Sequence, residues 1–202
     1  MIPFMKLPSL LWAVLVGVVL ALGTPLAWSV DTDQTVLLVA KRTLRDRVYG
    51  SSIVLARPLA EQRHVGFILN KPTNLTLGKL FPKHVPSQKI VDPVYLGGPM
   101  GPEVIFAMVK GNQSPGGRSL QLAPGLFLAF DSAIVDRIIE NQPQQARFLA
   151  GMVMWQPNEL AEEVKRGLWY VLEPQAEVVL RKSTDGLWEE LVNRSERKAN
   201  TI

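Results

Sequence analysis

Two short apolar runs that end abruptly in turn residues constrain most strongly what this chain can fold into. The first, GFILNKP, spans Gly66–Pro72, and the second, YLGGPM, spans Tyr95–Met100. Pro72 has no backbone donor and disfavours helical geometry at Lys71, and Asn70 can close a turn through its own side chain. The first run is therefore predicted to be a strand with a rigid end.

The second run ends in two glycines, Gly97 and Gly98, followed by a proline. Glycines permit positive φ and allow another backbone or a ligand to approach closely. The run does not have the spacing of the glycine-rich phosphate motifs, and no periodic helix follows it. A turn is therefore the predicted role of these glycines.

Eight segments combine β-branched and apolar residues between turn residues, which predicts strands. They are Thr35–Ala40, Ser52–Ala56, Val65–Asn70, Val94–Leu96, Glu103–Met108, Gly125–Phe130, Ala146–Trp155 and Trp169–Leu172. Three helices are predicted from a capping pair, a proline at a first helical position and a short apolar period. They span residues 132–141, 157–166 and 187–193, with Gly167 placed to end the second. The interleaving predicts an α+β or α/β domain with a mixed sheet.

The first 29 residues have the pattern of a secretory signal peptide. Lys6 supplies a positive charge, Leu10–Leu22 is an apolar run of thirteen residues, and Ala27–Ser29 places small residues at a cleavage site. Thirteen residues rise only about 20 Å as a helix, which is short of a hydrocarbon core about 30 Å thick. Cleavage after Ser29, a periplasmic location and no membrane span in the mature chain are therefore predicted. A membrane anchor formed by residues 7–28 stays open as the alternative.

Residues 30–194 are predicted to form one domain, and residues 195–202 a polar tail that frays. The sequence is 47% hydrophobic and 20% charged, which is the balance of a globular chain. It contains no cysteine, which excludes thiol nucleophiles and cysteine-type zinc sites. His64 and His84 follow polar residues and are predicted to lie in loops, outside any metal or triad motif. No cofactor is therefore expected.

Lys and Arg are scattered along the chain although the net charge is +4. Nucleic-acid-binding chains gather these residues into stripes or patches, and an exported chain rarely meets nucleic acid. A nucleic acid partner is therefore not expected, and the sequence leaves the oligomeric state open.

Two segments contain residues that can serve either in binding or catalysis or in a purely structural role. Asn70 and Lys71 lie at a strand end, where binding sites of sheet proteins often occur, but turn chemistry alone also explains them. Glu159 and Glu163 are one helical turn apart and can act as an acid–base pair, although a solvated helix face explains them as well. Trp155, just before this helix, suits either a core or a pocket wall.

Taken in order, these motifs resemble the AlgH/YqgE family of bacterial proteins. The matching segments are Gly66–Pro72, Val94–Pro99, Trp155 with Pro157, Glu159, Leu160 and Glu163, and then Gly167 with Trp169. The resemblance covers residues 35–193 and implies one domain with a mostly antiparallel or barrel-like sheet flanked by helices. The family has been linked to regulation of alginate production and is often labelled a transcriptional regulator, without a DNA-binding motif to justify that label.

The chain also departs from the family pattern. Met152 and Met154 stand where the family has an aromatic residue and a glycine, and Asn158 with Glu159 stands where Gly-Gln is usual. The cysteine of some members is missing, and most members lack a signal peptide. The chain is therefore interpreted as a divergent, exported relative.

The leading hypothesis is a non-enzymatic binding or regulatory domain that binds an unidentified small molecule or protein. Its candidate pocket consists of Asn70, Lys71, Pro72, Gly97, Gly98, Trp155 and Glu159. The alternative is a hydrolase or transferase that uses a carboxylate such as Glu159 together with Lys71. A transcriptional regulator, as the family is labelled, is a further alternative.

Overall fold

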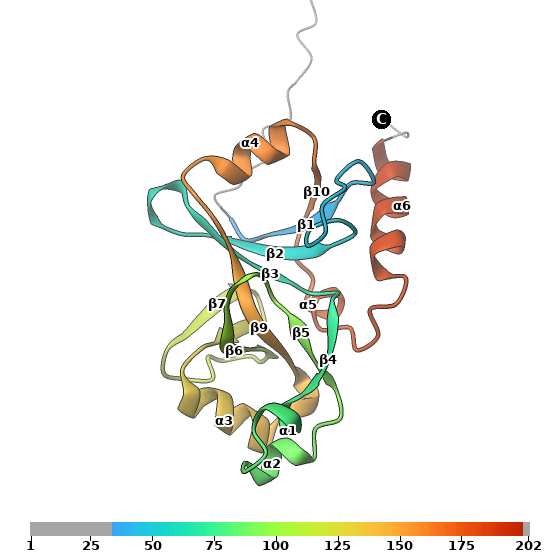
Figure 1. The fold of residues 1–202 in the computed structure, drawn as a ribbon. Coiled ribbons are helices and arrows are strands. Elements are labelled where there is room, and N and C mark those ends of the chain that lie inside the picture. The colour runs from blue at the N-terminus through green and yellow to red at the C-terminus, as the bar shows by residue number, and fades with distance from the viewer. Residues whose placement is uncertain (1–33, 200–202) are drawn as a thin grey trace, which may run out of the picture.

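The structure is a computed structural model that describes residues 34–199. The predicted signal peptide, residues 1–29, lies outside the described residues. Within residues 34–199, ten strands form one curled sheet (Figure 1). They are β1 (Val36–Ala40), β2 (Ile53–Pro58), β3 (His64–Ile68), β4 (Pro72–Thr76), β5 (Pro93–Leu96), β6 (Met100–Lys110), β7 (Ser119–Ala123), β8 (Leu126–Ala129), β9 (Ala146–Trp155) and β10 (Trp169–Leu172).

The strands follow the order β10-β1-β2-β3-β9-β6-β8-β7, with β4 paired to β5 and β5 paired to β9. The β5–β9 pair is parallel, and the other pairs among the described strands are antiparallel. This confirms the prediction of a single α+β domain with a mixed, mostly antiparallel sheet.

Helices flank this sheet at both ends and on one side. They are α1 (Leu77–Leu80), α2 (Val85–Gln88), α3 (Ser132–Asn141), α4 (Glu159–Lys165), α5 (Ala176–Val179) and α6 (Leu187–Ala199), with single 3₁₀ turns at Ala60–Gln62 and Pro143–Gln145. Figure 1 shows α4 over the layer of β1, β2 and β3, α1 to α3 at the opposite end, and α6 alongside β1 and β10. Each of these helices, within residues 34–199, is too short or too polar to span a bilayer.

Strand β1 shows why the upper half of the sheet is a buried layer. All five of its residues are buried, because both faces of the strand are covered. Leu37 and Val39 belong to the central core inside the curl, which also contains core residues of β3, β6, β8 and α6. Val36, Leu38 and Ala40 face the other way, into a cluster completed by residues of α4 and β10. Alternate residues of a strand point to opposite faces, so one short apolar run supplies two cores.

Helix α3 covers the end of the molecule opposite α4, and it has the cap and the apolar face that the sequence predicts. The Asp131 carboxylate accepts a hydrogen bond from the backbone N–H of Ala133 at 3.1 Å and so caps the helix. Ile134, Val135, Ile138 and Ile139 form its buried face and pack with residues of β6 and β8 in a third cluster. The predicted bounds of this helix are confirmed.

Strand β9 joins the two halves because it changes partners at a glycine. It pairs with β6 from Ala146 to Met152, with β5 at Leu149 and Ala150, and with β3 from Val153 to Trp155. Gly151, between the β5 and β3 pairings, has φ of +73°, and a Cβ there would lie 2.4 Å from the carbonyl oxygen of Gly98. Gly97 bridges the halves, since its N–H donates to the Ala150 carbonyl and its carbonyl accepts from Ile68, both at 2.8 Å. Two backbones therefore cross here without side chains between them.

Two helix ends differ from the sequence prediction. Helix α4 begins at Glu159 rather than at Pro157, because Asn158 adopts a left-handed φ of 64°. Gly167 has φ of +74° just beyond the end of α4, so its predicted role in ending the helix is confirmed. Helix α6 continues to Ala199, so the segment predicted to fray from residue 195 forms its last turns, with the Ser195 side chain buried.

Three strand features were also missed by the sequence prediction. His64 is not a loop residue: it begins β3 opposite Trp155 and is only 5% exposed. Strand β4 escaped prediction because it begins at Pro72 and is largely exposed, so it has no apolar run. Strand β7 is short, and only Leu122 and Ala123 at its end are buried.

The backbone crossing makes a specific prediction for Gly151→Ala. Both Gly151 and Gly186 have positive φ, but nothing lies within 4 Å of a Cβ built on Gly186. Gly186→Ala is therefore expected to lose about 1 kcal/mol of unfolding free energy from backbone strain alone. Gly151→Ala is expected to lose at least about 2 kcal/mol more, because its Cβ clashes with a backbone oxygen. Urea unfolding followed by circular dichroism measures both, and equal losses would contradict the close crossing.

Candidate functional site

Asn70 and Lys71 hold the loop between β1 and β2. The side-chain oxygen of Asn70 accepts a hydrogen bond from the N–H of Ile53 at 2.8 Å, and its amide nitrogen donates to the carbonyl of Ser51 at 2.9 Å. The ammonium of Lys71 donates to the carbonyl of Gly50 at 3.1 Å. Burial lowers the pKa of Lys71, and the charge of Asp46 opposes that shift. Both predicted site residues thus bind backbone of this loop.

Gly97 and Gly98 make their close approach to β9. A Cβ on Gly97 would lie 2.3 Å from the carbonyl oxygen of Gly151, and one on Gly98 would lie 2.2 Å from the backbone of Met152. Neither glycine has a positive φ. Pro72 starts β4 and pairs with Tyr95 of β5. These three predicted site residues are therefore packed against other strands.

Trp155 and Trp169 share one carboxylate acceptor. Their indole N–H groups donate to the same oxygen of Glu163, at 3.0 Å and 2.8 Å. Both rings are buried, and Gly66 makes room for one of them, since a Cβ there would lie 2.5 Å from Trp155. A half-buried carboxylate with two N–H donors is well satisfied without a ligand. These residues stand out in the sequence, but only the fold shows that they form one hydrogen-bonded unit.

A small cavity, called here the indole hollow, lies beside this unit. Its volume is about 90 Å³, and its lining includes Tyr49, Trp155, Glu159, Glu163 and Trp169. Burial raises the pKa of the Tyr49 hydroxyl, and the charges of Asp46, Glu163 and Glu159 add to the shift. The Glu159 carboxylate accepts the N–H of Gln156 at 2.8 Å. The hollow is well below the roughly 300–1,000 Å³ of typical ligand pockets.

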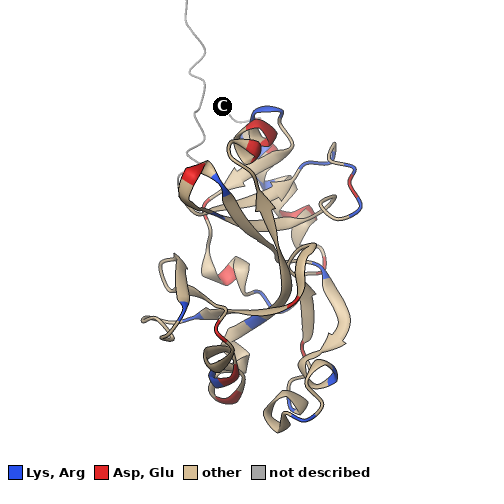
Figure 2. Ribbon diagram, turned by 60° about the vertical axis from the view of Figure 1, so that its left-hand side comes forward, with Lys and Arg blue, Asp and Glu red and all other residues tan. Residues whose placement is uncertain are grey.

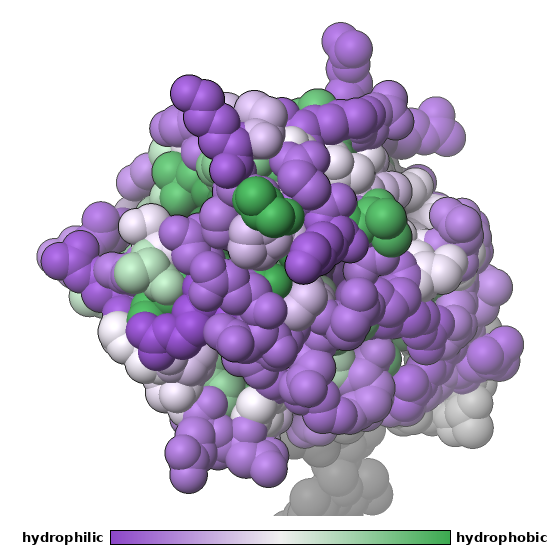
Figure 3. Space-filling model, turned by 90° about the horizontal axis from the view of Figure 1, so that it is seen from below, coloured by the Kyte–Doolittle hydropathy of each residue, from purple (hydrophilic) through white to green (hydrophobic). Residues whose placement is uncertain are grey.

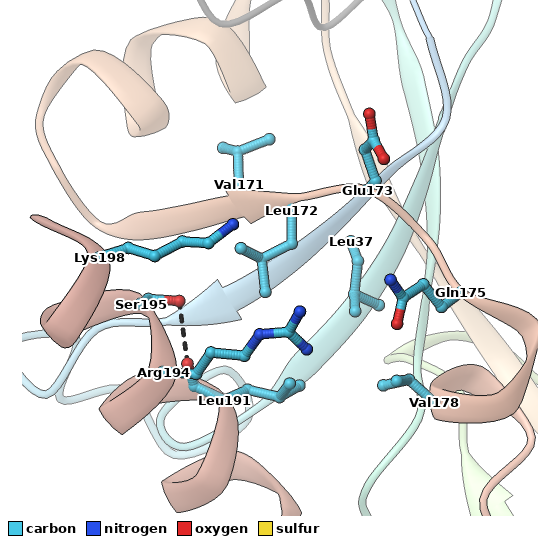
Figure 4. Close-up of a pocket in the computed structure, with 10 residues that line it drawn as sticks. All are labelled: Leu37, Val171, Leu172, Glu173, Gln175, Val178, Leu191, Arg194, Ser195 and Lys198. Atoms are coloured by element: carbon cyan, nitrogen blue, oxygen red, sulfur yellow. Dashed lines mark hydrogen bonds between the residues drawn. The ribbon is translucent and has the colours of Figure 1, made fainter.

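A larger cavity lies between α6, α5, the edge strand β10 and its neighbour β1, and is called here the α6 cavity (Figure 4). Its volume is about 370 Å³. Its apolar side chains come from strands and helices and are Leu37, Val171, Leu172, Val178 and Leu191. Its polar side chains are Glu173, Gln175, Arg194, Ser195 and Lys198. This volume lies at the lower end of the range for small-molecule sites.

The two cations of the α6 cavity are free of ion pairs among the described residues. Other charges near α6 are paired: Arg181 with Glu190 at 2.5 Å, and Arg42 with Glu196 at 3.4 Å. The pKa of Glu190 is lowered chiefly by its hydrogen bond from Arg181, and the charge of Arg194 makes the smallest contribution to that shift. Within residues 34–199, Arg194 and Lys198 have no acidic side chain within ion-pair distance.

Other charged and apolar surface features are less concentrated. Figure 2 shows Lys and Arg spread over several elements and interspersed with Asp and Glu, which agrees with the scattered basic residues of the sequence. The face of α1 to α3 carries hydrophobic residues as separate patches among hydrophilic ones (Figure 3). Two of the exposed apolar residues, Phe81 and Phe130, line an open groove beside α3. Residues 34–199 contain no group of three His, Asp or Glu side chains placed to hold a metal.

Comparison with known proteins places this fold. A model of the AlgH-like family matches residues 37–200. The chain belongs to this family. Among its relatives, a UPF0301 protein from Myxococcus xanthus is 30% identical over 156 residues, which cover 76% of this chain and 85% of that protein. A UPF0301 protein from Bacteroides fragilis is 27% identical over 168 residues, which cover 82% and 84% respectively.

Two solved structures have the same fold as this AlgH-like chain. One, from Corynebacterium diphtheriae, has a TM-score of 0.66 and 22% identity, and covers 80% of this chain and 86% of that one. The other is the AlgH protein from Pseudomonas aeruginosa, with a TM-score of 0.66, 18% identity, and coverage of 79% and 87%. At these identities the likeness supports the fold alone.

Two of the predicted pocket residues of this AlgH-like chain line the same cavity. Trp155 and Glu159 both line the indole hollow, whereas Asn70 and Lys71 hold the neighbouring loop. The α6 cavity was not predicted. Three of its polar residues, Arg194, Ser195 and Lys198, lie at or just before the segment interpreted as a frayed tail. Only the four-residue spacing of Arg194 and Lys198 hinted at a shared helix face.

The shared carboxylate makes a prediction for Glu163→Ala. This substitution leaves two buried indole N–H groups without their acceptor, so we expect a loss of about 3 kcal/mol of unfolding free energy. Glu162→Ala is the matched control, because Glu162 is exposed and pairs only with Lys165 at 3.7 Å. The control is expected to lose less than about 1 kcal/mol. Urea unfolding measures both, and similar losses would show that the indoles do not depend on Glu163.

Proposed function

We propose that this AlgH-like chain is a non-enzymatic binding domain and that its ligand occupies the α6 cavity. The observation that carries the proposal is the cavity itself, which combines an apolar floor with two cations that have no ion pair within residues 34–199. Concave sites with mostly apolar walls and a few convergent polar groups are the usual form of small-molecule sites.

Binding without catalysis is supported by the chemistry of the lining. Among the described lining residues, Ser195 alone carries a hydroxyl, which donates to the carbonyl of Leu191 at 2.9 Å. A serine nucleophile instead needs a base within hydrogen-bond reach, oriented by a third group. Glu159 and Lys71, the predicted carboxylate and amine, each contact backbone elsewhere. The lining therefore suits recognition of a ligand.

Filling the cavity tests this proposal. Gln175 is exposed and lines the cavity, so Gln175→Trp is expected to fill it without disturbing the core. Glu177→Trp, two residues further along in α5, is the matched control, because Glu177 is exposed and lies outside the lining. In a thermal-shift screen of soluble metabolites, we expect a bound compound at a hundred times its Kd to raise the Tm by about 5–10 °C. That rise should persist in the control and vanish in Gln175→Trp; identical rises in both variants would contradict the site.

We further propose that the domain acts in the periplasm after removal of residues 1–29. The support is the sequence pattern alone: a positive residue, a short apolar run and small residues at its end. An exported domain would meet ligands that enter the periplasm, so its compartment decides which compounds are available to the α6 cavity.

Fractionation tests the export proposal. In cells that express the full sequence with a C-terminal tag, we expect soluble periplasmic protein whose N-terminus is Val30. Leu15→Arg breaks the apolar run and is expected to retain the chain inside the cell, whereas Leu15→Ile keeps the run and is the matched control. A full-length cytoplasmic product would overturn the proposal, and a membrane-bound product that retains residues 1–29 would establish the anchor instead.

A further inference from the structure

The α6 cavity has an apolar floor and a cationic rim. Leu37 and Leu191 at the floor are each only 1% exposed, and they belong to the central core of the domain. Leu172 and Val178 are partly buried and pack against the same core. A ligand tail that reaches this floor removes its own apolar surface, and the exposed parts of Leu172 and Val178, from water, at about 25 cal/mol per Å².

The rim is formed by one face of α6. Arg194 and Lys198 are four residues apart, so their side chains lie on the same face of the helix. Figure 4 shows the guanidinium of Arg194 directed between Leu37, Leu172 and Leu191, and the ammonium of Lys198 close to Leu172. Both cations thus lie at the boundary between the floor and solvent.

The net charge of the lining is positive. Of the lining residues that lie within 34–199, Glu173 alone is acidic, and Figure 4 shows its carboxylate turned away from Arg194. Neither cation has an ion pair among the described residues, although nearby Arg42 and Arg181 do. A neutral ligand would leave both cations unused, and a cationic ligand would be repelled. An anion with an apolar part suits both the rim and the floor.

We propose that the α6 cavity binds a small amphipathic monoanion of the fatty-acid class, a carboxylate on a short saturated tail. The carboxylate is held by Arg194 and Lys198, and the tail lies against Leu37, Leu172 and Leu191. Arginine binds carboxylates through two parallel hydrogen bonds, and lysine adds a point charge. This assignment rests on the proposed binding function and names the ligand class of that site.

Three probes with the same tail test the headgroup. Octanoate, octanol and octylammonium are titrated, each below its critical micelle concentration, into protein purified after expression of the full sequence. Isothermal titration calorimetry measures each Kd. We expect octanoate to bind about tenfold more tightly than octanol, because each tenfold corresponds to about 1.4 kcal/mol, and octylammonium to bind more weakly still.

Charge-removing variants locate the anion. In the double variant Arg194→Gln with Lys198→Gln, the Kd of octanoate is expected to rise about tenfold while that of octanol stays unchanged. Arg197→Gln removes the same charge from the same helix, but Arg197 is outside the lining, so no change is expected. Gln175→Trp is expected to abolish binding of both octanoate and octanol.

The outcomes separate the ligand class from the site. Equal affinity for the three probes, or octanoate binding that is unchanged in the double variant, would overturn the anionic ligand while the binding function stands. If none of the three probes binds, but other compounds give thermal shifts that vanish in Gln175→Trp, the anionic ligand is likewise overturned while the binding function stands. Octanoate binding that survives in both Gln175→Trp and the double variant would show that the probe binds elsewhere, which overturns the α6 cavity as its site.

Discussion

The rest of this structure depends on one contact between backbones, the crossing of Gly97 and Gly98 over Gly151. A Cβ at any of these three positions would lie within 2.4 Å of a backbone atom of the crossing segment. Because the backbones meet directly, β9 can pair with β5 before the crossing and with β3 after it. The curl that encloses the central core follows from this change of partner.

The motifs that identify the family support this crossing. Asn70 ties the end of β3 to the start of β2, and Gly66 makes room for the Trp155 ring. Trp155 and Trp169 then fix α4 through Glu163. These residues are satisfied by one another, and the hollow beside them holds only about 90 Å³. The α6 cavity is built from other segments, so the family-motif residues and the residues that line the α6 cavity are separate sets.

Much of the fold was predictable because its elements are encoded locally. Strand β9 and helix α3 have the predicted bounds, since an apolar run and a capped amphipathic helix are visible in the sequence. The exposed strand β4 had no such pattern, and buried His64 follows polar residues, so both were missed. The cavity could not be predicted because its lining is drawn from residues 37, 171–178 and 191–198, which only the packed fold brings together.

The sequence by itself determined where strands stop and which family the motifs resemble, because proline, glycine and asparagine act on the backbone within a few residues. Tertiary structure alone decided what those stops do. In the packed domain the two glycines contact the backbone of β9, and Asn70 and Lys71 form hydrogen bonds with the backbone between β1 and β2. It also left Arg194 and Lys198 without ion pairs among the described residues, above an apolar floor. Burial and charge pairing depend on residues far apart in the chain, and for that reason the candidate site emerges only from the packed domain.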